Sequence, residues 1–273
     1  PLYGSLFLTE MVEFNAIHNP SRPFYIFYDE QDSCLHSISH PGSTAPANPS
    51  PMQSALTGSE SDNDIVGMIA NSDTILYQAL LMGVIHAGLI PIPLSLHNTS
   101  PAVADMMQKT ACYRLIATQH SLGSLVDGVR TELVSLGDML IQLRIDEPPT
   151  LAYAYLKLGK EAAATPFVPY SKVEKRPVSN DIMYYLHSPG SSGFPKSIPI
   201  TYEVGCRWCI RRDTLADVRI DAASLPSFHI TGMYFQLFIP VIYLKSVSVN
   251  APTSGRDPTA APVIANPQNT LNL

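Results

Sequence analysis

The sequence has few charged residues and no long run of basic ones. Charged residues make up 15% of its 273 residues, and the formal net charge is -6. A general nucleic-acid binder needs clustered Lys and Arg side chains, so we expect no nucleic-acid partner. Hydrophobic residues reach 45%, which predicts a globular fold rather than a disordered chain. The length suits one large domain or two small ones.

The sequence also lacks an uninterrupted apolar stretch of membrane-spanning length. Residues 75–94 come nearest, but Gln78, His86 and two prolines interrupt them, and the pattern changes at Gly88. A buried helix followed by a strand fits this pattern better than a span. We therefore expect no membrane association.

Cysteine is scarce too, with four residues in the chain. This number gives no dense disulfide framework, which favours a reducing compartment, and we expect the cytoplasm. Cys206 and Cys209 have C-x-x-C spacing, but no second pair completes a zinc site and no thioredoxin-like pattern surrounds them. On a helix these positions are three apart, so we interpret them as one packed face.

The most informative stretch is residues 184–202, YYLHSPGSSGFPKSIPITY. An apolar run over residues 182–186 breaks into small residues, which is typical of a buried strand that enters a tight turn. Glycines let backbone N–H groups approach a ligand, serine hydroxyls add donors, and a lysine suits phosphate oxygens. The stretch is neither a G-x-x-x-x-G-K-[ST] loop nor a G-x-S-x-G elbow. We interpret it as a polyphosphate-binding loop, and the alternative is a Ser/Gly turn without function.

The loop resembles the phosphate-binding signature of the adenylate-forming superfamily, which includes acyl-CoA synthetases, luciferases and the adenylation domains of peptide synthetases. That signature runs [ST]-[SG]-G-[ST]-[ST]-G-x-P-K, and the chain has SPGSSGFPK at residues 188–196. The one departure is Pro189, which removes a backbone N–H donor from the loop. The resemblance implies that the ATP phosphates contact Ser188, Gly190, Ser191, Ser192, Gly193 and Lys196.

The region from residue 65 alternates strand and helix patterns. We expect strands at 65–70, 89–94 and 113–118 and helices at 74–87, 100–110 and 121–136, each bounded by caps or glycine. This alternation predicts an α/β fold with parallel sheets flanked by helices. Residues 65–95 are similar to the strand–helix–strand segment of the same superfamily. The following NTSPAV resembles fungal adenylate-forming reductases, which join adenylation, carrier and reductase domains in one chain.

A second motif is LPSFHITG at residues 225–232. It matches the superfamily pattern P-x-F-H-x-x-G, so the resemblance makes His229 and Gly232 candidate contacts for AMP or the acyl substrate. An ordinary half-buried histidine is the alternative. The remaining histidines form no metal-binding spacing, so no metal ligands are assigned.

Other segments are expected from pattern alone. Residues 6–18 predict a helix, 24–28 a strand, 201–212 a helix that begins near the phosphate loop, 233–243 an apolar helix and 246–249 a strand. Residues 39–63 predict a flexible Pro/Ser-rich loop where the family normally has a hairpin and a helix, neither of which is expected here.

The resemblance implies an activity. Such proteins join a carboxylic acid to the α-phosphate of ATP with Mg²⁺, and phosphopantetheine and NADPH belong to the carrier and reductase domains of a longer chain. The later Y-G-x-T-E, T-G-D and terminal lysine motifs do not occur, and the chain starts at Pro1. We therefore expect residues 1–273 to be the N-terminal part of an incomplete AMP-binding domain without its C-terminal lid subdomain, inactive on its own.

Two other functions remain open at this point. One is a degenerate relative that binds ATP or AMP without catalysis, which Pro189 and the unusual residues 39–63 suggest. The other is a hydrolase that uses Ser191 or Ser192 with His229, although no nucleophile elbow supports it. The sequence does not indicate which carboxylic acid is used.

Overall fold

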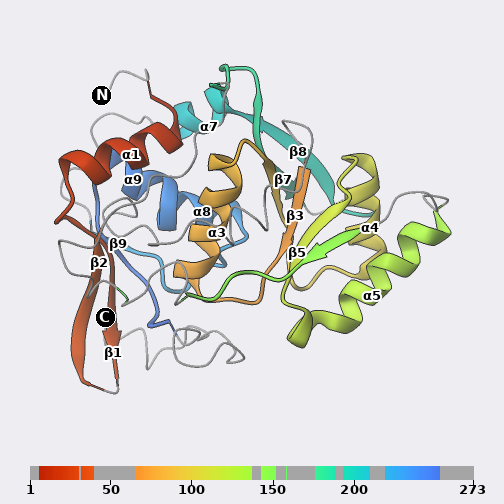
Figure 1. The fold of residues 1–273 in the computed structure, drawn as a ribbon, viewed down its shortest axis with the longest axis horizontal. Helices are drawn as coiled ribbons and strands as arrows, with labels where there is room; N and C mark the ends of the chain where they lie inside the picture. The colour runs from red at the N-terminus through yellow and green to blue at the C-terminus, as the bar shows by residue number, and fades with distance from the viewer. Residues whose placement is uncertain are drawn as a thin grey trace.

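A computed structural model describes residues 6–30, 32–39, 65–136, 143–151, 158, 176–188, 193–209 and 219–252. These residues form a mixed sheet, a parallel sheet and a two-stranded hairpin, with helices packed around them (Figure 1). The prediction of an α/β fold with parallel sheets flanked by helices is confirmed. None of the helices in these ranges is long and apolar enough to cross a membrane.

The parallel sheet has the strand order β4-β3-β5-β6. Its strands are β3 (Ile65–Ile69), β4 (Ile90–Pro93), β5 (Arg114–Ala117) and β6 (Arg144–Asp146), and its helices are α3 (Thr74–His86), α4 (Ser100–Lys109) and α5 (Gln119–Ser135). Every expected strand and helix of this region is present within a few residues. β6 was not predicted, because a three-residue strand with polar ends has no visible periodicity.

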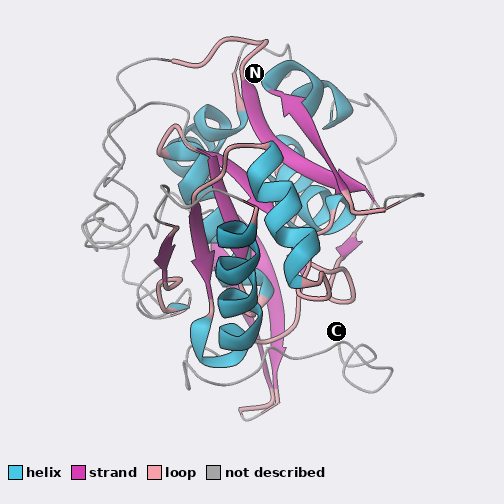
Figure 2. Ribbon diagram, turned by 90° about the vertical axis from the view of Figure 1, so that its right-hand side faces the viewer, coloured by secondary structure: helices cyan, strands magenta, loops and turns pink. Residues whose placement is uncertain are grey.

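Strand β3 is buried on both faces, as expected for a strand at the centre of a parallel sheet. Val66 and Met68 belong to the core that includes α3, while Ile69 belongs to the core under α4 and α5. Gly67 leaves room for Leu115 on the neighbouring strand, because a Cβ at this position would lie 2.9 Å from Leu115 Cδ1 and the leucine side chain would have to shift. Figure 2 shows two helices lying across the strands on the α4–α5 side.

Local signals set the ends of α3. The Asp73 carboxylate accepts a hydrogen bond from the backbone N–H of Leu76 at 3.2 Å, as an N-cap residue does. After the helix, Gly88 adopts φ +75°, a conformation that favours glycine and turns the chain toward β4.

The mixed sheet has the strand order β2-β1-β10-β9. Its strands are β1 (Pro23–Asp29), β2 (Cys34–Ser39), β9 (Ile220–Asp221) and β10 (Val247–Ser248). β1 and β2 pair antiparallel, so a hairpin immediately precedes the segment at residues 40–63, and the expectation that this segment lacks a hairpin and a helix stays a prediction. β2 was missed because Ile38 is its one buried residue, so the strand shows no alternation of buried apolar and exposed polar positions. The predicted loop at residues 39–63 lies almost entirely outside the described residues.

The helices α1 (Leu8–His18) and α9 (Ile239–Tyr243) pack together on one side of the molecule (Figure 1). Asn15 is buried in this contact and donates a hydrogen bond from Nδ2 to the carbonyl of Val241 at 2.7 Å. The single helix expected at residues 233–243 is in fact three consecutive segments: α8 (Ile230–Met233), the π-helix η1 (Tyr234–Phe238) and α9.

Candidate functional site

The phosphate-binding signature lies at one end of an antiparallel hairpin. Strand β7 (Ile182–Ser188) pairs with β8 (Lys196–Thr201), and the last pair joins Ser188 to Lys196. The first and the last residue of the signature therefore face each other across the two strands. The sequence predicted the first strand but not the second, because β8 contains Pro199.

Pro199 is tolerated because β8 pairs with one strand only in this two-stranded sheet, so its missing N–H belongs to an edge. β7 is the supporting strand. It lies against β4, with Tyr184 in the core around α3 and Tyr185 against the core under α4 and α5. Packing on both faces fixes the position of β7, although Met183 and Tyr184 are its only fully buried residues and its Ser188 end is partly exposed.

Three of the predicted phosphate contacts fall outside the described residues: Gly190, Ser191 and Ser192. Among the others, Gly193 has φ +156°, which strains any side-chain-bearing residue, and no atom would meet a Cβ there within 4 Å. Gly193 is thus required by backbone conformation and leaves an open approach to its backbone. Lys196 is exposed, and its ammonium group can reach an anion at this end of the hairpin.

The expectation that the helix after the phosphate loop begins near that loop is wrong. α7 (Tyr202–Cys209) follows β8 directly, and Thr201 pairs with Ile182 at the opposite end of the hairpin from Ser188 and Lys196. Six strand residues span roughly 17–20 Å. The positive end of α7 is therefore too far from the loop to stabilise a phosphate there, since dipole effects fall off within the first turn.

His229 is the N-cap residue of α8 and is exposed. Its Nδ1 accepts a hydrogen bond from the backbone N–H of Thr231 at 3.3 Å and lies 2.9 Å from the Thr231 hydroxyl. A nitrogen that accepts from a backbone N–H carries no proton, so the neutral ring holds its proton on Nε2. That atom is left to face a ligand as a donor.

Gly232 has a steric role in the same motif. A Cβ at this position would lie 2.0 Å from the carbonyl oxygen of Pro226, closer than any real contact. The same oxygen accepts a hydrogen bond from the backbone N–H of His229 at 3.0 Å. The H-x-x-G spacing therefore lets the first turn of α8 fold back against the preceding loop. This accounts for Gly232 without a ligand, and its predicted contact with AMP or an acyl group stays a prediction.

The two motifs share an electrostatic environment. Burial, mainly, and the charge of His229 lower the pKa of His187, the residue that precedes Ser188. The two histidines interact in this way although 42 positions separate them in the printed sequence. A phosphate at the Ser188 end would accordingly lie within electrostatic range of both rings.

A buried tyrosine pair joins the hairpin to the segment after His229. Tyr184 Oη on β7 lies 3.1 Å from Tyr234 Oη on η1, and Tyr234 Oη also donates to the carbonyl of Gly205 on α7 at 3.4 Å. Sequence reasoning missed this connection, because both tyrosines stand in apolar runs that predict only packing. The available signal was a phenol in a buried position, which needs a hydrogen-bond partner.

The C-x-x-C pair lies on α7 as predicted for a helical face. Cys206 is a free thiol whose pKa is raised, chiefly by burial, so it is a poor nucleophile. The side chain of Cys209 lies outside the described residues.

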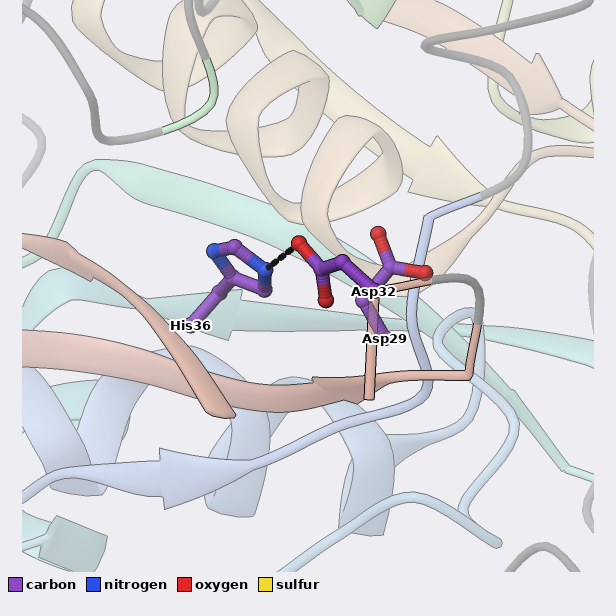
Figure 3. A group of neighbouring side chains, drawn as sticks. All are labelled: Asp29, Asp32 and His36. Atoms are coloured by element: carbon purple, nitrogen blue, oxygen red, sulfur yellow. Dashed lines mark hydrogen bonds and ion pairs between the residues drawn. The ribbon is translucent and has the colours of Figure 1, made fainter. Parts of the chain in front are cut away.

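One group of metal-ligand types occurs elsewhere, at the turn of the β1–β2 hairpin (Figure 3). Asp32 Oδ2 lies 2.7 Å from His36 Nε2, and Asp32 Oδ1 accepts a hydrogen bond from the Cys34 N–H at 3.0 Å. The Asp32 contacts are those of a local turn. This hairpin stands on the opposite side of the molecule from β7 and β8 (Figure 1).

The parallel sheet with helices packed around it defines an α/β protein. Within that class, the chain belongs to the AMP-binding enzyme family, which it matches over residues 61–264. The family membership suggested by SPGSSGFPK and LPSFHITG is thereby confirmed.

The relatives are fungal. The chain is 41% identical over 278 residues to adenylate-forming reductase Nps11 of Serpula lacrymans var. lacrymans (strain S7.9), covering 99% of this chain and 25% of the relative. It is 38% identical over 271 residues to Nps9 of the same fungus, covering 97% of this chain and 24% of the relative. The chain thus spans about a quarter of the length of these curated relatives.

Solved structures share the fold. A fatty acyl-adenylate ligase from work on E. coli and L. pneumophila has a TM-score of 0.63 at 20% identity, covering 91% of this chain and 41% of that one. The anthranilate CoA ligase AuaEII, in complex with anthranoyl-AMP, has a TM-score of 0.63 at 17% identity, covering 91% of this chain and 45% of that one. The chain therefore shares its fold with part of each of these structures.

Proposed function

We propose that this chain is the N-terminal part of an adenylation domain that activates a carboxylic acid with ATP as an acyl-adenylate. The observation that carries the proposal is the match to the AMP-binding enzyme family over residues 61–264, which includes both the Ser188–Lys196 pair at the end of the hairpin and His229. Transfer of an adenylyl group concentrates negative charge on the departing pyrophosphate, so catalysis depends on cations and N–H donors held in place. Membership of the AMP-binding family and the name shared by the reductase relatives support this assignment.

The described residues have distinct parts in this reaction. Lys196 would pair with the β- and γ-phosphate oxygens, and the Ser188 hydroxyl would donate to the same group. His229 would donate from Nε2 to the phosphate or the acyl carboxylate. Mg²⁺ would be bound through the phosphate oxygens and would neutralise their charge. Phosphopantetheine and NADPH would serve carrier and reductase domains of a longer chain, as the length of the relatives allows.

The test is ATP–pyrophosphate exchange in the full-length natural protein, screened against a panel of carboxylic acids. We expect Lys196→Ala to lower exchange by at least about a hundredfold, because one charged contact to the transition state is lost. Lys109→Ala is the matched control: it removes an exposed lysine of α4, and we expect no change. Exchange that survives Lys196→Ala would overturn the proposed role of the loop. ATP binding without exchange for any acid would instead favour a degenerate nucleotide-binding relative.

A further inference from the structure

Two glutamines far apart in the sequence form a buried pair beside the loop that precedes α8. We call residues 222–229 the His229 loop. Gln78 lies on α3 and Gln236 lies in the middle of η1, and both are 0% exposed. Gln78 Nε2 donates a hydrogen bond to Gln236 Oε1 at 2.9 Å. Neither residue belongs to the phosphate-loop or histidine motif. Gln78 stands out in the sequence only as a polar interruption of an apolar helix.

The hydrogen bonds determine how each amide is oriented. Gln236 Nε2 donates to two backbone carbonyls, those of Ala222 at 2.9 Å and Leu225 at 2.8 Å. Its two protons are thereby used, so Gln236 must present Oε1 to Gln78, and Gln78 must present Nε2 in return. The second proton of Gln78 Nε2 goes to the carbonyl of Ser227 at 3.3 Å. The two amides together bind three carbonyls of residues 222–227.

Helix α3 holds the same loop at a second point. The Ser227 hydroxyl lies 3.4 Å from the hydroxyl of Thr74, four residues before Gln78 and therefore on the same face of the helix. Ser227 is thus contacted through both its backbone and its side chain by one face of α3. Ser227 precedes His229 by two residues. The backbone of Gly232 packs closely against the carbonyl oxygen of the neighbouring Pro226.

The π-helix η1 carries side chains that contact both the β7–β8 hairpin and the loop before His229. Tyr234 and Gln236 both lie in η1, and they point to different partners: Tyr234 to Tyr184 on β7, and Gln236 to the loop at residues 222–225. π-helical segments are rare and occur frequently at functional sites. Here one short segment ties the His229 loop and the phosphate-loop hairpin to the same framework.

We propose that Gln78 and Gln236 are positioning residues for His229, and that their buried amide pair sets the location of its ring relative to the Ser188–Lys196 end of the hairpin. The catalytic part of this inference rests on the proposed function. Stability alone does not account for the pair, because Gln78 Oε1 is buried and has no hydrogen-bond partner among the residues that the structure describes. A buried polar atom in that state is costly, and two apolar side chains of similar size would avoid the cost.

The test uses the full-length natural protein with Gln78→Leu, Gln236→Leu and the double substitution, each made with His229 and with His229→Ala. The control is Thr110→Val, which removes buried hydrogen bonds to the carbonyls of Met106 and Met107 at the end of α4. Two readouts are taken: kcat and KM of ATP–pyrophosphate exchange, and amide hydrogen exchange of the peptide over residues 222–233.

We expect each leucine substitution to lower kcat about tenfold when His229 is present and less than about twofold in the His229→Ala background. The difference is expected because the glutamines affect kcat through the position of the His229 ring. We also expect amide exchange over residues 222–233 to rise about tenfold in these variants, while Thr110→Val leaves both readouts unchanged. The double leucine variant, which replaces the pair with apolar groups, is expected to fold and to show the same kcat loss.

An equal loss of kcat in both His229 backgrounds would overturn the positioning role, since the glutamines would then act on stability alone. Unchanged amide exchange over residues 222–233 would overturn it too, whatever the kinetics. Absence of pyrophosphate exchange in the unsubstituted protein would instead overturn the proposed function, and the amide-exchange readout would still decide whether the pair holds the loop.

Discussion

His187 at the end of β7 stands within electrostatic range of His229 at the start of α8. Burial first, and then the charge on His229, lower the pKa of His187 below its ordinary value of 6.5. The relationship joins the two sequence motifs in one electrostatic environment. It also makes the folded chain sensitive to mild acid.

The sign of that sensitivity follows from the lowered pKa of His187. Below pH 6.5 the unfolded chain binds a proton that the folded chain resists, so the free energy of unfolding falls as the pH decreases from 6.5 toward the lower folded-state pKa of His187. Above pH 6.5 neither state is protonated and the group has no effect. We expect His187→Asn to reduce the drop in Tm between pH 7.5 and pH 5.5, as followed by circular dichroism. His120→Asn, an exposed substitution on α5, is the control; an identical drop in both variants would refute the assignment.

Gly232 is expected to tolerate no side chain. A Cβ there would collide with the Pro226 carbonyl at 2.0 Å, so Gly232→Ala should displace the His229 loop and lower the free energy of unfolding by about 2–3 kcal/mol. Gly123→Ala is the matched control, because no atom lies within 4 Å of a Cβ in that part of α5. We expect this second change to stabilise the protein by about 0.5–1 kcal/mol. Chemical denaturation of both variants measures the difference, and similar values would contradict it.

The Tyr184–Tyr234 pair is expected to contribute to stability through its hydroxyl groups. Tyr234→Phe removes the contact with Tyr184 Oη at 3.1 Å and the bond to the Gly205 carbonyl at 3.4 Å, which should cost about 1–2 kcal/mol. Tyr184→Phe should cost about 1 kcal/mol, and the double variant less than the sum of the two. Urea denaturation of the three variants gives the coupling free energy. Strict additivity would show that the hydroxyl contact carries no interaction energy.

The parallel sheet was predictable because its signals are local. The apolar run of β3, the Asp73 cap and the Gly88 stop of α3 each act within a few residues, and together they specify a strand, a helix and their order. β2 and β6 were not predictable, because exposed or very short strands depend on a partner strand rather than on their own periodicity. The π-helix was missed for a related reason, since an apolar run does not distinguish i+4 from i+5 hydrogen bonding.

The candidate site, too, was predictable from the sequence only in part. Ser188, Gly193, Lys196, His229 and Gly232 could be named from two motifs, and their resemblance to a family is confirmed by the match over residues 61–264. The helix expected to support the phosphate loop was misplaced. Lys196 begins a strand, and that strand carries the chain away from the loop before α7 starts. A pattern in sequence does not state in which direction the chain leaves a turn.

The sequence by itself determined the family, the nucleotide-binding motifs and the order of strands and helices in the parallel sheet, because these depend on residue types at short spacing. Only the tertiary structure decided that His187 and His229 share one electrostatic environment, that Gly232 is required by the Pro226 carbonyl, and that Gln78 and Gln236 donate hydrogen bonds to the loop at residues 222–227. Each of these relations joins residues through space, where burial removes water and leaves every polar group dependent on the partner that folding supplies.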